Sequence, residues 1–167
     1  MIRSATGTDV SELLARVVRH PRDFSAVTLC SPFIDGDATA VLKTLANNCE
    51  RDQLGVRVLT NRRGKALLRS ASVVGRSQSH VICGDIRNLH AKVYVAIGRR
   101  ATHSLAIVTS ANLTRAGMNA NVEFGVLVSP TSDAGCKLFG EIVEFVNGLQ
   151  TASGRRRPRG VHRGLIR

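Results

Sequence analysis

Residues 89–128, with the sequence LHAKVYVAIGRRATHSLAIVTSANLTRAGMNANVEFGVLV, carry the pattern that decides the fold. Three runs rich in β-branched and aromatic residues, Leu89–Ile97, Ser104–Thr109 and Asn121–Val128, are bounded by Gly, Asn or Ser, as is typical of strands. The first two are predicted to pair as a hairpin that turns at residues 98–104. The three runs therefore predict a β-meander, and the polar residues inside it need a separate explanation.

Two polar features interrupt these apolar runs. His90 and Lys92 are two residues apart, so on a strand they are predicted to share one face, about 7 Å apart. Glu123 stands between Val122 and Phe124 in the third run. An unpaired buried carboxylate is costly, so Glu123 is predicted to have a partner.

Together these residues resemble the signature of the phospholipase D superfamily. The matching set is His90-x-Lys92, then Ser110-x-Asn112-x-Thr114, then Glu123, and it is most similar to the short, single-motif nucleases of that family. The family usually has an Asp five residues after the Lys, where this chain has Ile97. That Asp is mainly a supporting residue in the family, and the related tyrosyl-DNA phosphodiesterases lack it.

The resemblance implies a metal-independent phosphodiesterase mechanism. One His90 would attack phosphorus and form a phosphohistidine, while a second His90 would protonate the leaving oxygen. Lys92 would hold the non-bridging oxygens, Asn112 and Ser110 would donate hydrogen bonds to them, and Glu123 would accept from the imidazole. Family members with two motifs place both at one site, so a chain with one motif is expected to form a two-fold homodimer through its motif strands.

Simpler explanations exist for each part of the set. A lone His-x-Lys pair is usually surface decoration, and Ser110-x-Asn112-x-Thr114 could be turn and cap residues alone. Glu123 could be paired with an Arg. The joint match of all three parts in the family's order favours the functional interpretation.

The charge of the chain points to a polyanionic partner. The formal net charge is +12, and six of the 24 basic residues are Arg in residues 151–167, which contain no acidic residue. A solubilising surface is the alternative, and Arg residues in turns could simply be solvated. The candidate phosphate contacts are Arg62, Arg63, Arg99, Arg100, Arg115, Arg155, Arg156 and Arg157.

The periodicity predicts one α/β domain over residues 1–150 and a disordered basic tail over 151–167. Helices alternate with strands and then give way to the meander, which predicts a mixed sheet between helices, an α/β/α sandwich with one motif per chain. The expected helices cover 8–20, 36–50, 63–73 and 131–149, with one helical turn at 113–118, and the expected strands before the meander cover 26–30, 55–60 and 79–83. Leu138, Ile142, Phe145 and Val146 are predicted to form the buried face of the last helix.

Composition also narrows the class of protein. No apolar run approaches the ~18 residues of a membrane span, and the first residues form no apolar signal segment, so the chain is expected to be cytoplasmic. The four cysteines, Cys30, Cys49, Cys83 and Cys136, lack a CxxC spacing and three lie within apolar runs, so they are predicted to be buried free thiols in a reducing compartment. No metal-ligand or phosphate-loop spacing is present, so no metal or cofactor is predicted.

The leading hypothesis is a phospholipase D-like phosphodiesterase acting on nucleic acid as a homodimeric endonuclease, with DNA favoured over RNA. One alternative is a catalytically silent nucleic-acid-binding module, which only the residue at Ile97 supports. The other is a lipid phosphodiesterase, against which the aromatic content of 4% and the lack of a membrane-seeking segment count. Strand preference, sequence specificity and any helicase or recognition partner stay open.

Overall fold

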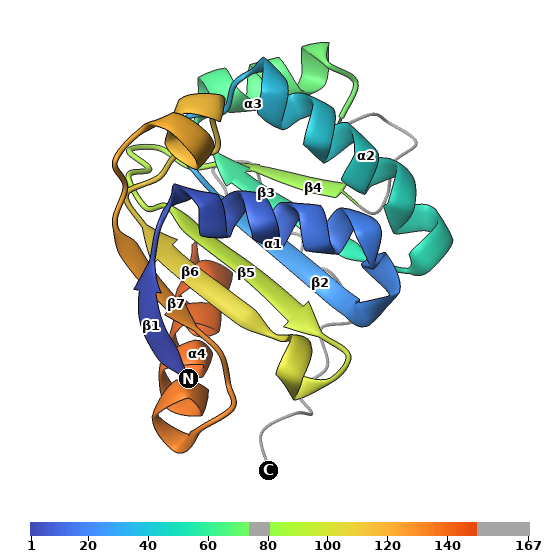
Figure 1. The fold of residues 1–167 in the computed structure, drawn as a ribbon. Helices are drawn as coiled ribbons and strands as arrows, with labels where there is room; N and C mark the ends of the chain where they lie inside the picture. The colour runs from blue at the N-terminus through green and yellow to red at the C-terminus, as the bar shows by residue number, and fades with distance from the viewer. Residues whose placement is uncertain (74–80, 150–167) are drawn as a thin grey trace.

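The computed structural model describes residues 1–73 and 81–149, which contain a seven-stranded mixed sheet (Figure 1). The strand order across the sheet is β1-β7-β6-β5-β2-β3-β4, so the described edge strands are β1 and β4. The strands are β1 Ile2–Ala5, β2 Phe24–Cys30, β3 Gly55–Thr60, β4 Val81–Asp85, β5 Val93–Gly98, β6 Leu105–Thr109 and β7 Gly125–Val128.

Four α-helices begin at polar cap residues. The helices are α1 Gly7–Arg19, α2 Gly36–Asp52, α3 Arg62–Ser70 and α4 Asp133–Gly148, with short 3₁₀ segments η1 Pro21–Asp23 and η2 Ala101–His103 and a π-helical turn η3 Ala116–Ala120. The side chains of Asp35, Asn61 and Ser132 accept hydrogen bonds from backbone N–H groups at the starts of α2, α3 and α4. Each expected long helix is therefore present close to its predicted start.

The sheet has an apolar cluster on each face. On one face, buried residues of α1, α2 and α3, such as Leu13, Leu45 and Leu68, pack against Val27 and Tyr94 of the sheet. On the other face, Ile142 and Val146 of α4 belong to a second cluster of buried residues, whose other members are Cys30, Leu59, Leu89, Val93, Val95, Ala106 and Val128. This arrangement confirms the predicted mixed sheet between helices.

Because of the strand directions, the chain enters or leaves every strand at one common edge of the sheet. β2, β3 and β4 are parallel, β5 is antiparallel to β2, and β6 is antiparallel to β5. β7 is antiparallel to both β6 and β1. The C-terminal ends of β1, β2, β3, β4 and β6 therefore meet the N-terminal ends of β5 and β7. We call this the site edge.

Two strands are shorter than predicted, and neither contains the motif residues at its expected start. β5 begins at Val93 rather than Leu89, because its partner β2 ends at Cys30, opposite Val93, and is followed by Ser31 and Pro32. β7 begins at Gly125, although Ser110 N–H still donates to Phe124 O at 2.9 Å. The prediction that His90, Lys92 and Glu123 lie on strands is therefore wrong, because all three lie in connecting segments.

Other boundaries also differ from expectation. β1 was not predicted, since a four-residue strand is stabilised only by its pairing with β7 far along the chain. The third helix ends at Ser70, and the expected turn at 113–118 is π-helical over 116–120. The predicted inward position of Phe145 is wrong, because 49% of this residue is exposed. The tail at 151–167 lies outside the described residues.

Candidate functional site

Backbone hydrogen bonds join the segments that carry the motif. Lys92 O accepts from Thr109 N–H at 3.1 Å, which ties the segment before β5 to the end of β6. Phe124 O accepts from Ser110 N–H at 2.9 Å, which ties the end of β6 to the approach to β7. The residues of His90-x-Lys92, Ser110-x-Asn112 and Glu123 therefore lie on neighbouring segments at the site edge.

A buried layer beneath the motif holds the Ser110–Leu113 segment in place. Tyr94 O–H donates to Ala111 O at 2.9 Å, and Ser31 Oγ accepts from Leu113 N–H at 2.9 Å. Tyr94 is fully buried, and this burial raises the pKa of its phenol. Tyr94 thus keeps its proton and acts as an anchor for the motif backbone.

His90 is exposed and available for chemistry. Within the described residues, no hydrogen bond or ion pair engages its imidazole, and its backbone O accepts from Lys92 Nζ at 3.1 Å. Ala91, between the two, accepts at its carbonyl from Cys30 Sγ at 3.7 Å. The imidazole is therefore open to an incoming group, and the ammonium lies beside the same backbone segment.

The side-chain amide of Asn112 has an oxygen atom that makes no hydrogen bond within residues 1–73 and 81–149. Its Oδ1 is buried and has no hydrogen-bond partner among the described residues. An unpaired buried polar atom costs about 1–3 kcal/mol, so it requires an explanation in the fold. A bound group that donates a hydrogen bond there would remove this cost.

Glu123 has partners other than the expected imidazole. Its carboxylate accepts a short hydrogen bond from Ser110 O–H and another from Asn121 Nδ2 at 3.1 Å. Ser110 Oγ in turn accepts from Phe124 N–H at 3.1 Å. The prediction of a partnered carboxylate is confirmed, but the partners are Ser110 and Asn121 rather than His90 or an Arg. The Ser110 proton is therefore directed to Glu123.

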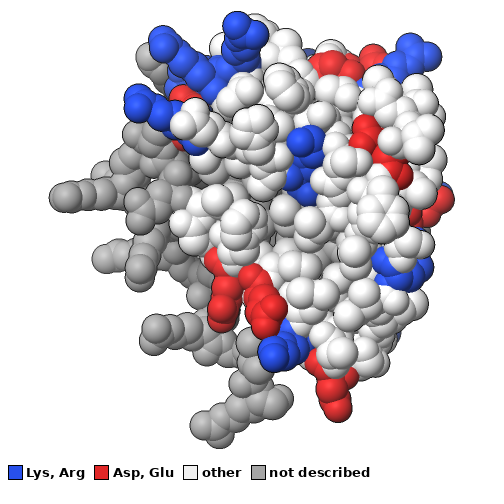
Figure 2. All heavy atoms as spheres, turned by 90° about the vertical axis from the view of Figure 1, so that its left-hand side faces the viewer, with Lys and Arg blue, Asp and Glu red and all other residues white. Residues whose placement is uncertain are grey.

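The predicted phosphate-binding arginines divide into three groups. Arg62 and Arg63 open α3 directly after β3, and Arg115 follows the motif, so these three lie at the site edge. Arg115 also lies with its Nε 3.8 Å from Asp37 Oδ2. Figure 2 shows several basic side chains gathered at the upper left of this side of the molecule, with acidic atoms visible among them.

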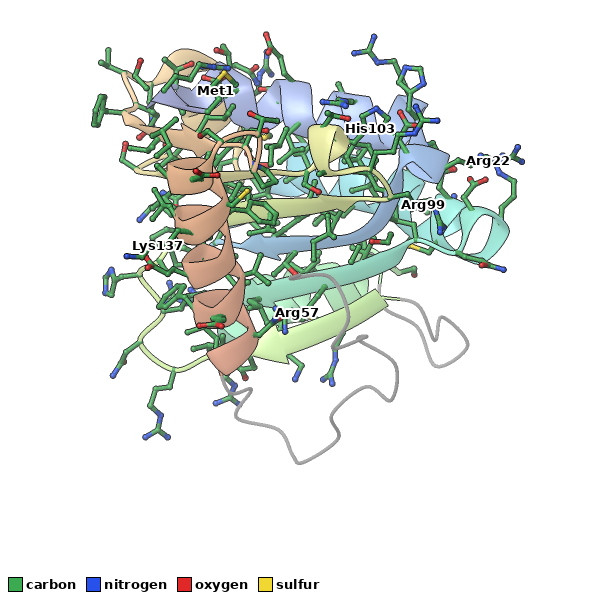
Figure 3. The ribbon with its side chains drawn as sticks, turned by 90° about the horizontal axis from the view of Figure 1, so that it is seen from below. Met1, Arg22, Arg57, Arg99, His103 and Lys137 are labelled. Carbon is green, nitrogen blue, oxygen red and sulfur yellow. The ribbon has the colours of Figure 1, made fainter. Side chains whose placement is uncertain are left out.

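Arg99 and Arg100 lie at the other end of β5, away from the site. Arg99 Nε donates to Arg22 O at 3.1 Å, and Figure 3 shows Arg99 and Arg22 at the end of the sheet remote from α4. The structure thus does not bring Arg99 or Arg100 to the candidate site. Arg155, Arg156 and Arg157 lie outside the described residues.

A pocket of about 430 Å³ opens beside the motif. The pocket is lined by His90 and Lys92, by Val108 and Thr109 at β6, and by Glu141, Ile142 and Phe145 of α4. Sequence reasoning did not assign Glu141 or Phe145 to the site, because only the docking of α4 on the sheet places them there. It also missed Tyr94 and Ser31, which look like ordinary core residues in the sequence.

The one departure from the family signature lies far from the site. Ile97 is on β5, five residues beyond Lys92, or roughly 16 Å along an extended strand. It packs against the α4-side core cluster. The apolar residue at this position therefore removes no group from the site edge.

Comparison with known proteins shows the family of this chain. Residues 23–141 match the family described as "Cardiolipin synthase, PLD-like domain", which is most of the chain. The chain therefore belongs to the phospholipase D superfamily. No curated protein matches it in sequence.

Solved structures share the fold at low sequence identity. Nuc of Salmonella typhimurium, a phospholipase D family member, is 14% identical with a TM-score of 0.53, over 92% of this chain and 97% of Nuc. TrmBL2, an archaeal chromatin protein, is 8% identical with a TM-score of 0.52, over 90% of this chain and 54% of TrmBL2. The phosphatidylserine synthase of Haemophilus influenzae Rd KW20 is 12% identical with a TM-score of 0.58, over 93% of this chain and 40% of the synthase.

No three His, Cys, Asp or Glu side chains in residues 1–73 and 81–149 are grouped as a metal site would require. None of the described helices has the length and apolar character needed to cross a membrane.

Proposed function

We propose that this chain is a metal-independent phosphodiesterase that cleaves nucleic acid, DNA in preference to RNA, at a site completed by a second copy of the chain. The observation that carries the proposal is the open imidazole of His90 beside Lys92 and Asn112 at one sheet edge. The net charge of +12 supports a polyanionic substrate. TrmBL2, which shares the fold, is described as binding DNA.

The chemistry proceeds in two displacements. The neutral imidazole of one His90 attacks phosphorus, and a P–N bond forms as the bond to the leaving oxygen breaks. The imidazolium of the second His90 gives its proton to that oxygen. It then takes a proton from water as the water oxygen attacks phosphorus and the P–N bond breaks. Both histidines return to their starting states, so the site neither gains nor loses a proton over the cycle.

Lys92 and Asn112 stabilise charge on the non-bridging oxygens in this mechanism. Lys92 Nζ exchanges its hydrogen bond with His90 O for a phosphate oxygen, which its flexible stem permits. Asn112 would donate a hydrogen bond from Nδ2 to a non-bridging oxygen, whereas its Oδ1, unpaired within the described residues, is an acceptor and does not contact that oxygen. Glu123 positions Ser110, and its support of an imidazole would require exchange of one of its two present hydrogen bonds.

The homodimer follows from the need for two histidines. A nucleophile and an acid must act on opposite sides of phosphorus, and no second His-x-Lys pair occurs in the chain. Phe33, Val122 and Phe124 lie on the segments of the site edge and are 56%, 105% and 71% exposed. Exposed apolar side chains beside an open imidazole fit an isologous interface at this edge.

The proposal is tested by cleavage in the presence of a chelator. We expect the full chain to cleave single- or double-stranded DNA in EDTA and the His90→Ala variant to lose at least a thousandfold in rate, because it lacks both nucleophile and acid. A gel assay with labelled DNA and RNA measures both. Activity that disappears in EDTA and returns with Mg²⁺ would rule the mechanism out.

A second candidate function is lipid phosphodiester cleavage. The family description names cardiolipin synthase, and apolar side chains line the pocket beside His90. Inhibition of diester turnover by short-chain phosphatidylglycerol, but not by DNA, would favour this function. The silent binding module predicts DNA binding with no turnover of any diester.

A further inference from the structure

The pocket beside His90 has a composition that phosphate chemistry does not require. Val93 and Ile142 form buried apolar lining, at 3% and 8% exposure, while Val108 and Phe145 stay 40% and 49% exposed at the pocket. Phe145 lies on α4 among residues expected to face the core, yet half of it stays accessible. An accessible ring over an apolar floor is suited to stacking with a flat ligand.

One polar acceptor lies in the same pocket. Glu141, one helical turn before Phe145 on α4, lines the pocket. No hydrogen bond or ion pair among the described residues engages its carboxylate. His90 and Lys92 also line this pocket, so the groups proposed to bind phosphate share it with apolar side chains and a hydrogen-bond acceptor.

We propose that this pocket takes a nucleobase next to the scissile phosphate, with Phe145 as the stacking surface and Glu141 as the acceptor for an exocyclic amine. This inference rests on the proposed function, whose substrate it specifies. The volume of about 430 Å³ lies within the usual range of small-molecule pockets. Adenine, cytosine and guanine carry an exocyclic amine that a carboxylate accepts from, and thymine does not.

An acyl chain is the competing occupant, and Glu141 disfavours it. A hydrocarbon tail offers no hydrogen-bond donor, so its entry would remove water from the carboxylate without replacing the lost hydrogen bonds. A nucleobase replaces them. The base must also leave its stack to enter a pocket bordered by α4, so the pocket selects single-stranded nucleic acid over a duplex.

The test measures binding of 12-residue oligonucleotides to the full chain carrying His90→Ala, by fluorescence anisotropy. A strand of abasic residues with the same number of phosphates should bind about tenfold or more weakly than oligo-dA or oligo-dC, because stacking is lost. Phe145→Ala should remove most of that difference. Glu141→Gln should remove the preference for oligo-dA and oligo-dC over oligo-dT.

Glu144→Gln is the matched control, because Glu144 is exposed on the same helix, changes charge equally and does not line the pocket. It should leave base preference unchanged. Equal binding of abasic and base-bearing strands, an effect of Glu144→Gln equal to that of Glu141→Gln, or displacement of the strand by short-chain phosphatidylglycerol would overturn the proposal. A separate assay tests the proposed function itself. If that function is wrong, the chain with His90 intact will not hydrolyse bis(4-nitrophenyl) phosphate, a diester that carries no nucleobase.

Discussion

Asp52 is a carboxylate that the fold keeps charged at the sheet edge opposite the site. Its side chain is 2% exposed, and it accepts from Arg22 Nε at 3.0 Å and from Arg51 Nε at 3.1 Å. The hydrogen bond from Arg22 lowers the pKa of Asp52 below its usual 3.8. Arg99 joins this group by donating to Asp52 O at 3.4 Å, so Arg99 supports η1 and α2 rather than the site.

The lowered pKa of Asp52 predicts how the free energy of unfolding depends on pH. Because the folded pKa lies below the unfolded value, Asp52 contributes stability above about pH 4 and loses it as the pH falls through the folded pKa. Asp52→Asn should therefore lower the free energy of unfolding at pH 6, and its difference from wild type should shrink below pH 4. Urea unfolding at pH 6, 4 and 3 measures this, and a difference that is independent of pH would refute it.

The four cysteines differ in how deeply their side chains are buried. Cys30 and Cys49 are buried and Cys83 is partly buried, but Cys136 is exposed, so the prediction of a buried thiol is wrong for Cys136. Burial raises the pKa of the Cys30 thiol to about 11. Thiolate is the reactive form, so Cys30 is protected both by its depth and by its proton.

At the scale of elements, α4 lines the pocket beside His90. Two glycines of this helix, Gly135 and Gly140, differ in whether a side chain would fit. A Cβ at Gly135 would lie 2.4 Å from Ser129 O, whereas a Cβ at Gly140 would meet nothing within 4 Å. Gly135 is therefore required where the first turn of α4 passes the end of β7. Gly140 only weakens the helix.

These two positions form a matched pair of substitutions. Gly140→Ala should raise the free energy of unfolding by about 0.5–1 kcal/mol, through the reduced entropy of the unfolded chain. Gly135→Ala should lower it by about 1–3 kcal/mol, since the backbone must shift to relieve the overlap. Urea denaturation of both variants measures the difference. Equal effects in the two variants would show that the start of α4 yields more easily than its contacts indicate.

For the whole molecule, the proposed dimer makes a kinetic prediction. When wild-type chains exchange subunits with excess His90→Ala chains, each mixed dimer lacks either its nucleophile or its acid. Activity should then fall as the square of the wild-type fraction. Turnover of a small diester, read after equilibration at several ratios, measures the curve. A linear fall, or full activity of a monomer in sedimentation, would mean that each chain carries a complete site.

Local pattern in the sequence was sufficient for much of this protein. The starts of α2 and α4, the strand at 55–60 and the hairpin of β5 and β6 follow from caps, turn residues and apolar runs. The ordered set of His90, Lys92, Ser110, Asn112 and Glu123 also predicted the family. Such features depend on residues near one another in the chain, and the sequence displays them directly.

Tertiary packing alone decided the rest. β5 starts at Val93 because β2 ends opposite it, and no feature within residues 89–97 marks that limit. Glu123 bonds to Ser110 because β6 and β7 bring them together, and Phe145 lies beside His90 because α4 docks across the sheet. Arg99 and Arg62 look alike in sequence, but strand direction sends them to opposite edges. Contacts between distant segments depend on how the elements pack. The sequence therefore predicted which chemical groups form the site, whereas the tertiary structure determined which residues lie next to them.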